Sequence, residues 1–181
     1  MSLSRENEVK LYYLYMMADG EVSPFEMLNF MRISEKLGVE EEKRKAIVKE
    51  TESLEGYEDE IFKNIKNIVE KNESLSFEKS QAVHNASIIW NLVNIGYADS
   101  VYSSAEKRIV SYLVERWKVE PDIYQEFVDT ADTLLALTEQ KIWTSNAYRD
   151  ENKKAEKEKM IDEEKELLVS NIELTLQELG E

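Results

Sequence analysis

The sequence predicts an all-α protein: a compact helical bundle built from two duplicated helical-hairpin units, with a charged C-terminal helix. Three observations support this fold class. Apolar residues make up 42% of the chain, which is enough for a core. Only five Gly and two Pro occur, whereas a protein of many short strands needs frequent turns. Apolar side chains also recur at the spacing of a helix in most segments.

The few Gly and Pro residues divide the chain into helices. Gly20, Gly38 and Gly56 each follow an apolar-periodic segment, where a left-handed C-terminal cap favours glycine. Pro24 and Pro121 each stand at an expected first helical turn, where the missing N–H group is not needed.

The first half is expected to form four helices. The first is apolar on nearly all sides at its end, which is typical of a central, buried element. The third is strongly charged, and the fourth has isoleucines at helical spacing. The second has one apolar face, formed by Met27, Phe30, Met31 and Leu37. The expected bounds are about Glu6 to Ala18, Pro24 to Leu37, Glu40 to Leu54 and Glu58 to Lys71.

The second half repeats this plan. A long apolar helix is followed by a capped helix that turns Trp117 inward. A third helix begins at Pro121 and carries apolar residues as far as Leu135, and a further helix carries Ile142 and Trp143.

The two halves also align directly. Residues 18–40 match residues 98–120 without a gap, and seven of the 23 positions are identical. A solenoid would need at least three copies, so we interpret the repeat as an internal duplication of a helical hairpin. The identical pairs are Ala18/Ala98, Asp19/Asp99, Ser23/Ser103, Glu26/Glu106, Glu35/Glu115, Val39/Val119 and Glu40/Glu120.

The C-terminal part has a different character. Charges of both signs alternate from Arg149 to Glu166 at distances that allow i,i+4 ion pairs, which indicates an exposed helix. Apolar residues at helical spacing show that one face must pack on the body or on another chain; they are Ile161, Leu168, Ile172, Leu176 and Leu179. We therefore predict an all-helical domain over residues 1–148 and a charged helical extension over 149–181.

Composition excludes several classes of function. A net charge of −15 repels phosphate backbones and disfavours nucleic-acid binding, while it attracts cations or basic partners. The chain has no Cys and only His84, so thiolate sites, multi-His zinc sites and a Ser-His triad are not expected. The longest apolar run, Leu11 to Ala18, is shorter than the ~20 residues of a membrane span. With no secretory signal either, we expect a cytoplasmic protein that is not an enzyme.

The repeated motif has a structural explanation. The segments Ser23-Pro-Phe-Glu26 and Ser103-Ser-Ala-Glu106 both fit a capping box, in which Ser and Glu satisfy each other's backbone N–H groups at a helix start. Capping does not explain the Asp that precedes the turn in both copies.

The same residues also suggest a ligand site. Asp19 and Glu26 flank one interhelical turn, and Asp99 and Glu106 flank the other. If the halves pack about a pseudo-twofold axis, the four carboxylates gather there. Oxygen ligands without His or Cys suit Ca²⁺ or another hard divalent cation. The spacing is not that of an EF-hand, whose ligands extend over twelve residues.

With these residues in place, the sequence resembles the TerB-like tellurite-resistance domain family. The family pattern is Ala-Asp-Gly, a hydrophobic residue, Ser, two spacers and Glu, and it occurs twice around an all-helical fold. Both copies match it, although Ser100 replaces the second Gly. The resemblance implies a stress-response role and metal binding by Asp19, Glu26, Asp99 and Glu106.

Four hypotheses follow. The protein is a non-enzymatic module that binds a divalent cation, or a metal-free scaffold that recognises a protein partner while the motifs act only as helix caps. The others are a hydrolase that uses clustered carboxylates, which lacks the Glu-x-x-His pairs of di-iron bundles, and an oligomer, such as a homodimer, formed through the C-terminal helix.

Overall fold

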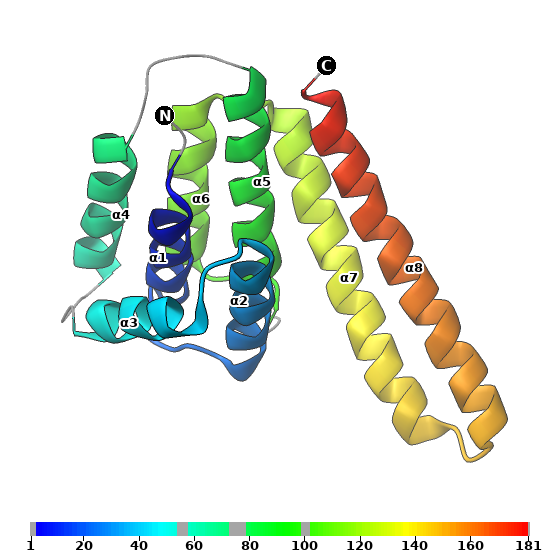
Figure 1. The fold of residues 1–181 in the computed structure, drawn as a ribbon. Helices are drawn as coiled ribbons and strands as arrows, with labels where there is room; N and C mark the ends of the chain where they lie inside the picture. The colour runs from blue at the N-terminus through cyan, green and yellow to red at the C-terminus, as the bar shows by residue number, and fades with distance from the viewer. Residues whose placement is uncertain (1–2, 54–57, 73–78, 99–101, 181) are drawn as a thin grey trace.

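The computed structural model of the chain describes residues 3–53, 58–72, 79–98 and 102–180, and within these ranges it is all-helical, as predicted (Figure 1). The helices of these ranges are α1 (Arg5–Met16), α2 (Pro24–Lys36), α3 (Glu41–Glu52), α4 (Glu58–Asn72), α5 (Lys79–Gly96), α6 (Ser104–Trp117), α7 (Pro121–Ala147) and α8 (Glu151–Glu178).

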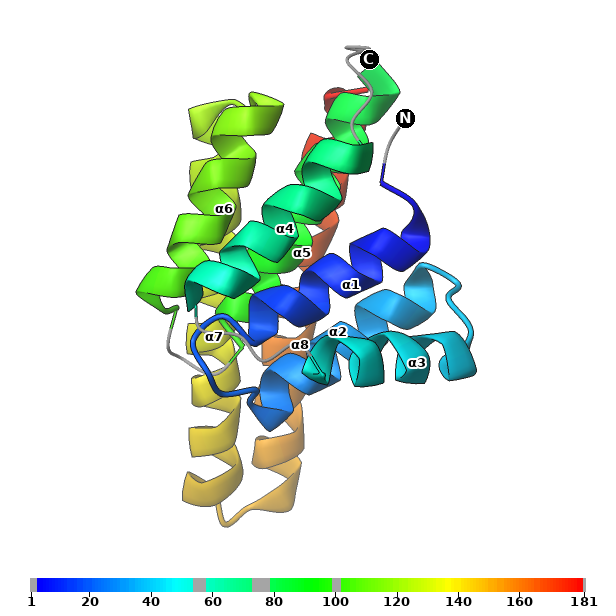
Figure 2. The same cartoon turned by 90° about the vertical axis from the view of Figure 1, so that its left-hand side faces the viewer.

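Helices α1 and α5 form the centre of the body. α1 packs against α2, α3, α4, α5 and α6, and α5 also packs against α7 and α8. Figure 2 shows α1 running between α4 and α3. The prediction of a central first helix is confirmed, since its second half is buried on all sides through Leu11, Tyr12, Tyr13, Leu14, Tyr15 and Met16.

The ends of α2 and α6 have the same local geometry. Gly38 follows α2 with a φ angle of +69°, and Lys118, its counterpart in the repeat, ends α6 with a φ angle of +53°. In both places the next residue, Val39 or Val119, donates its N–H group back into the last helical turn. The recurrence agrees with the aligned sequences. A superposition of the two units as wholes stays a prediction.

Gly20 also has a positive φ angle, +91°, as expected for a glycine after a helix. Gly56 lies outside the described residues. Met31 differs from the sequence analysis: it was placed on the apolar face of the second helix, but it is 36% exposed. Phe30, also predicted on that face, is fully buried, and Ile33, which was not, is buried with it.

Helices α7 and α8 form a long antiparallel hairpin whose far half projects beyond the body (Figure 1). Ile172 of α8 belongs to the main core, and Ile161 is buried against α7. Polar contacts along the hairpin include the Lys141–Asp162 ion pair at 2.6 Å and a hydrogen bond from Lys165 Nζ to Thr138 Oγ1 at 2.8 Å. The prediction that one face of the tail is packed is therefore confirmed.

The prediction of two helices after Pro121 is wrong. α7 is continuous from Pro121 to Ala147, and it includes Ile142 and Trp143, which are 55% and 63% exposed. Beyond the body, the helix turns Leu137 and Thr144 toward α8, so its buried face no longer follows the pattern of its first turns.

Candidate functional site

Both predicted capping boxes are present. In the first, Glu26 Oε2 accepts the N–H of Ser23 at 2.7 Å, and Ser23 Oγ accepts the N–H of Glu26 at 3.1 Å. In the second, the corresponding distances between Ser103 and Glu106 are 2.8 and 3.2 Å. One carboxylate oxygen of each Glu is therefore used to start a helix.

The two motifs lie near each other in the fold. A cavity of about 380 Å³ is lined by the turn of the first motif, which contains Asp19 and Gly20, and by Ser103, Ser104 and Ala105 of the second. Contacts between α1 and α6 hold the two segments together. The packing thus places the helix start of the second motif, Ser103 to Ala105, beside the turn of the first motif, which contains Asp19 and Gly20.

The glutamates of the motifs are buried although their helix starts are at the surface. Glu26 and Glu106 are each only 2% exposed. Burial raises the pKa of Glu106 to about 7, and the charges of Glu26 and Asp19 add to the rise, while the hydrogen bonds from Ser103 oppose it. Near neutral pH, both the charged and the neutral form of Glu106 are therefore populated.

Three residues that sequence reasoning missed enclose Glu106. A Cβ atom at Gly96 would lie 2.3 Å from the hydroxyl oxygen of Tyr15, 2.9 Å from Cδ2 of Tyr102 and 3.0 Å from Oε1 of Glu106. Among the described residues, neither Glu106 Oε1 nor the Tyr15 hydroxyl has a hydrogen-bond partner of good geometry. Burial raises the pKa of Tyr15 well above its usual value, and the charges of Tyr102 and Glu106 and hydrogen bonding of the hydroxyl toward Glu106 add to the rise.

The aromatic run that contains Tyr15 was the available signal. Its other two members, Tyr12 and Tyr13, are buried and donate their hydroxyls to Glu8 and Glu52. The run therefore supplies three polar groups to the interior, but only the tertiary structure shows which one meets the motif.

The predicted set of four carboxylates is only partly located. Asp19 is exposed, and its Oδ1 accepts the N–H of Glu21 at 3.2 Å, which closes the turn. Asp99 lies outside the described residues. Within the described part of the chain, no three acidic or His side chains are placed to hold one metal ion.

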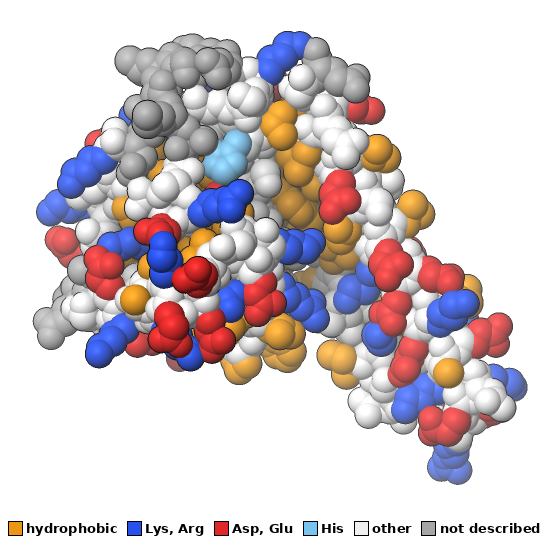
Figure 3. Space-filling view, in the orientation of Figure 1, with side chains coloured by type: hydrophobic (Ala, Val, Ile, Leu, Met, Phe, Trp, Pro, Cys, Tyr) orange, Lys and Arg blue, Asp and Glu red, His pale blue; other side chains and the backbone are white. Residues whose placement is uncertain are grey.

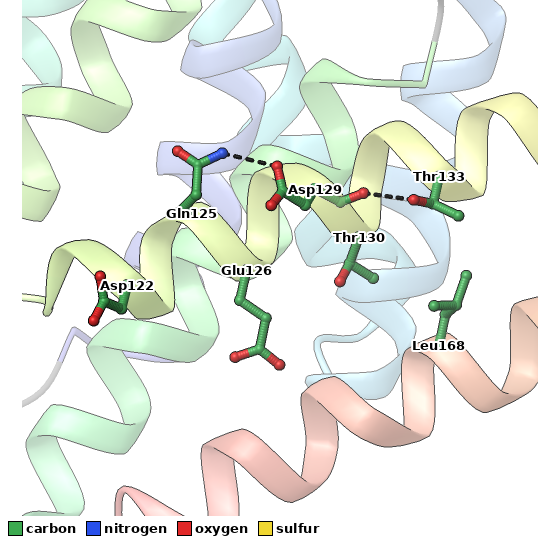
Figure 4. A pocket seen from close by; sticks show the side chains of 7 residues that line it. All are labelled: Asp122, Gln125, Glu126, Asp129, Thr130, Thr133 and Leu168. Atoms are coloured by element: carbon green, nitrogen blue, oxygen red, sulfur yellow. Dashed lines mark hydrogen bonds between the residues drawn. The ribbon is translucent and has the colours of Figure 1, made fainter.

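A second acidic region lies on α7 beside α8. Asp122, Glu126 and Asp129 line a groove of about 390 Å³ next to Leu168 of α8 (Figure 4). Two of these carboxylates have partners within the protein: Asp129 accepts from Gln125 at 2.8 Å, and Glu126 accepts from Thr175 at 2.9 Å. The groove adds to the negative electrostatic potential of the surface, but it is not a preformed ligand-binding site.

The single histidine is not part of the motif region. His84 Nε2 lies 3.5 Å from Oε2 of the buried Glu8, whose pKa burial raises. Glu8 also accepts from Tyr12, which in turn accepts from Asn91. The group is a polar contact between α1 and α5.

Comparison with protein families gives one match: residues 7–127 match the family described as Tellurite resistance protein TerB. The match covers more than half of the chain and contains both acidic motifs. The chain belongs to the TerB family, and its helical body is a tellurite-resistance-type module.

No curated protein and no solved structure matches the chain. In the described part of the chain, every helix is too short or too polar to cross a membrane.

Proposed function

We propose that this chain is a non-enzymatic, cytoplasmic stress-response module that binds a divalent cation, Ca²⁺ or another, at its paired acidic motifs. The observation that supports the proposal is Glu106. Its Oε1 atom is buried beside the Tyr15 hydroxyl without a hydrogen bond of good geometry among the described residues, and burial, with the charges of Glu26 and Asp19, raises its pKa. A cation at this point would relieve the repulsion and give the oxygen a partner.

The donor chemistry fits a hard cation in part. Glu106 Oε1 and the carboxylate of Asp19 are oxygen ligands of the kind that Ca²⁺ takes. Glu106 uses Oε2 for its cap, which leaves Oε1 for an ion. A complete ligand set would need Asp99, which lies outside the described residues, or backbone oxygens of the turns.

A thermal-stability experiment tests this proposal. The protein is melted with a chelator and then with Ca²⁺, Mg²⁺ or Zn²⁺ at constant ionic strength, as wild type and with Asp19→Asn plus Asp99→Asn. A cation that binds only the folded state at 100 times its Kd stabilises that state by about 2.7 kcal/mol. The double variant should lose this gain.

A matched control is needed because any divalent cation screens a strongly acidic surface. Asp122→Asn with Asp129→Asn removes the same charge from the groove on α7 and should leave the cation effect unchanged. If no cation shifts the wild type, or if both double variants lose the effect equally, the motifs are helix caps only.

A proton measurement gives a second readout. A cation at Glu106 displaces the proton that this group carries near pH 7. Calorimetric titrations in buffers of different ionisation enthalpy should therefore show proton release, which Glu106→Gln abolishes.

A second candidate function is self-association through α8, which would make the chain an interaction scaffold. Met160, Leu167 and Leu174 are 55%, 62% and 55% exposed and recur every seven residues along one side of α8. This spacing keeps them in line on a helix. Among the described residues, no element covers them.

We propose that this stripe packs against the same stripe of a second copy of the chain, in an antiparallel arrangement centred on Leu167. Met160 of one copy then meets Leu174 of the other. The flanking Glu163 and Glu164 face the neutral Ser170 and Asn171, so like charges are kept apart. One helix face is smaller than a standard interface of ~1,600 Å², so we expect a weak dimer.

Sedimentation equilibrium over a range of concentrations tests the dimer. Leu167→Glu should make the chain monomeric without unfolding it, because the side chain is exposed. Trp143→Glu, at an equally exposed apolar site on α7, is the control. If the wild type stays monomeric at several hundred micromolar, self-association through α8 is excluded as a function.

A further inference from the structure

A pocket separate from the acidic motifs lies between α2 and α3. Its volume is about 320 Å³, at the lower end of the range for small-molecule sites. Much of its wall is apolar, formed by Met27, Phe30, Met31 and Val48. None of its lining residues belongs to the cavity at the two motifs.

One wall of this pocket holds an under-paired cation. Arg44 is only 7% exposed, and among the described residues its Nε and Nη1 atoms have no hydrogen-bond acceptor. The nearest carboxylate is that of the exposed Glu35, whose Oε1 lies 3.5 Å from Arg44 Nη1. A charge-assisted hydrogen bond is 2.7–2.9 Å long, so this pair leaves the guanidinium short of acceptors.

The other charged side chains of the pocket have partners of different kinds. Glu41 forms an ion pair with Lys45 at 2.7 Å, and Glu52 accepts a hydrogen bond from the neutral hydroxyl of Tyr13 at 2.9 Å. Lys49 makes no ion pair with another described residue, so it adds to the positive charge beside Arg44. The lining therefore combines an apolar wall with three basic and two acidic side chains, counted without Glu35, in a protein whose net charge is −15.

We infer that this pocket binds a small monocarboxylate with an apolar body. The carboxylate takes the place of Glu35 beside Arg44, and the body lies against Met27, Phe30 and Met31. A guanidinium that is taken out of water needs acceptors, and an incoming carboxylate supplies them together with charge. An uncharged molecule of the same shape lacks that contribution.

The methionines allow a direct test. Sodium octanoate is titrated into protein labelled at the methionine methyl groups. The Met27 and Met31 methyl signals should shift and saturate in the millimolar range or below. Met160, exposed on α8 far from the pocket, reports non-specific adsorption and should not shift. 1-Octanol, which has the same chain without the charge, should bind at least ten-fold more weakly.

Two variants test the assigned contacts. Arg44→Met keeps much of the aliphatic volume and should weaken octanoate binding at least ten-fold, while octanol binding stays the same. Its melting temperature should not fall, because an under-paired buried charge is removed. Glu35→Gln removes the competing carboxylate and should strengthen octanoate binding two- to five-fold. Arg32→Met, an exposed arginine on α2, is the matched control and should change neither ligand.

Three results would overturn the inference. They are an absence of shifts at Met27 and Met31 up to 10 mM octanoate, equal binding of octanoate and octanol, and unchanged octanoate affinity in folded Arg44→Met protein. Equal shifts at Met160 and Met31 would also count against it, because they indicate adsorption to exposed apolar side chains.

Discussion

The hydroxyl of Tyr15 and the Oε1 atom of Glu106 lie against the same face of Gly96, one from α1 and the other from α6. Both are within 3.0 Å of the point where a Cβ atom at Gly96 would stand. Residues of α1, α5 and α6 thus meet at the buried carboxylate of Glu106, which belongs to the second motif. The first two predictions concern this meeting point.

Stability should depend on pH through Glu106. Its pKa rises from 4.5 in the unfolded chain to about 7 in the fold, so the folded state binds more protons between these values. Stability should therefore fall as the pH rises from 4.5 to 7, by about 3 kcal/mol at ~1.4 kcal/mol per pKa unit. Glu106→Gln, which can still accept from Ser103, should lack this loss.

Urea unfolding of both proteins at pH 5 and pH 8 checks the prediction. The difference between variant and wild type should grow toward pH 8 in favour of the variant. Glu139→Gln, an exposed site on α7, should run parallel to the wild type. A parallel course for Glu106→Gln as well would show that burial does not shift this group.

Gly96→Ala should destabilise the protein although alanine is the better helix former. Propensity alone would add stability, but the new methyl group would stand 2.3 Å from the Tyr15 hydroxyl oxygen. We expect a loss of about 1–3 kcal/mol from overpacking. Combining it with Tyr15→Phe should recover part of this loss, since the closest atom is then gone. Thermal unfolding of the two single variants and the double variant measures the coupling; additive effects would contradict the contact.

Lys118→Gly should stabilise the protein by about 0.5–1 kcal/mol. Lys118 ends α6 in the left-handed region, where a residue with a Cβ atom is strained and glycine is not. The reciprocal change, Gly38→Lys, should cost about 1 kcal/mol at the matching position, because the space around Gly38 is ordinary and only the backbone is strained. Chemical denaturation measures both, and a loss of stability in Lys118→Gly would refute the argument.

The two buried isoleucines of α8 should respond differently to truncation. Ile172 belongs to the main core, so Ile172→Ala should lower the global unfolding free energy by about 2–5 kcal/mol. Ile161 is buried in the projecting hairpin and outside that core. Ile161→Ala should therefore speed amide exchange in the far half of α7 and α8 while α5 exchange changes little. Equal global losses would show that the hairpin unfolds only with the body.

Local features of the fold were accessible from sequence because local chemistry determines them. Ser23 with Glu26 forms a capping box wherever the chain starts a helix there, and the second copy repeats it with Ser103 and Glu106. The apolar spacing around Ile172 likewise required a packed face.

The remaining features depend on which helices meet. The aromatic run marks Tyr15 only as one of three tyrosines, Gly96 carries no signal of its own, and their contact with Glu106 exists only because α1, α5 and α6 pack together. The same holds for Arg44, which is buried at a pocket lined by residues of both α2 and α3. The length of α7 was missed because its outer half is buried by α8 rather than by the body, which changes the face that must be apolar.

Figure 3 shows acidic and basic side chains intermixed on the projecting half of the hairpin and hydrophobic side chains gathered where the hairpin meets the body.

Helix α7 passes from the body into the hairpin without interruption. The family match ends at residue 127, inside α7, and no Gly or Pro follows in that helix up to Ala147. The direction in which the exposed tip around Trp143 points is therefore set by the same helix that places Phe127 in the core.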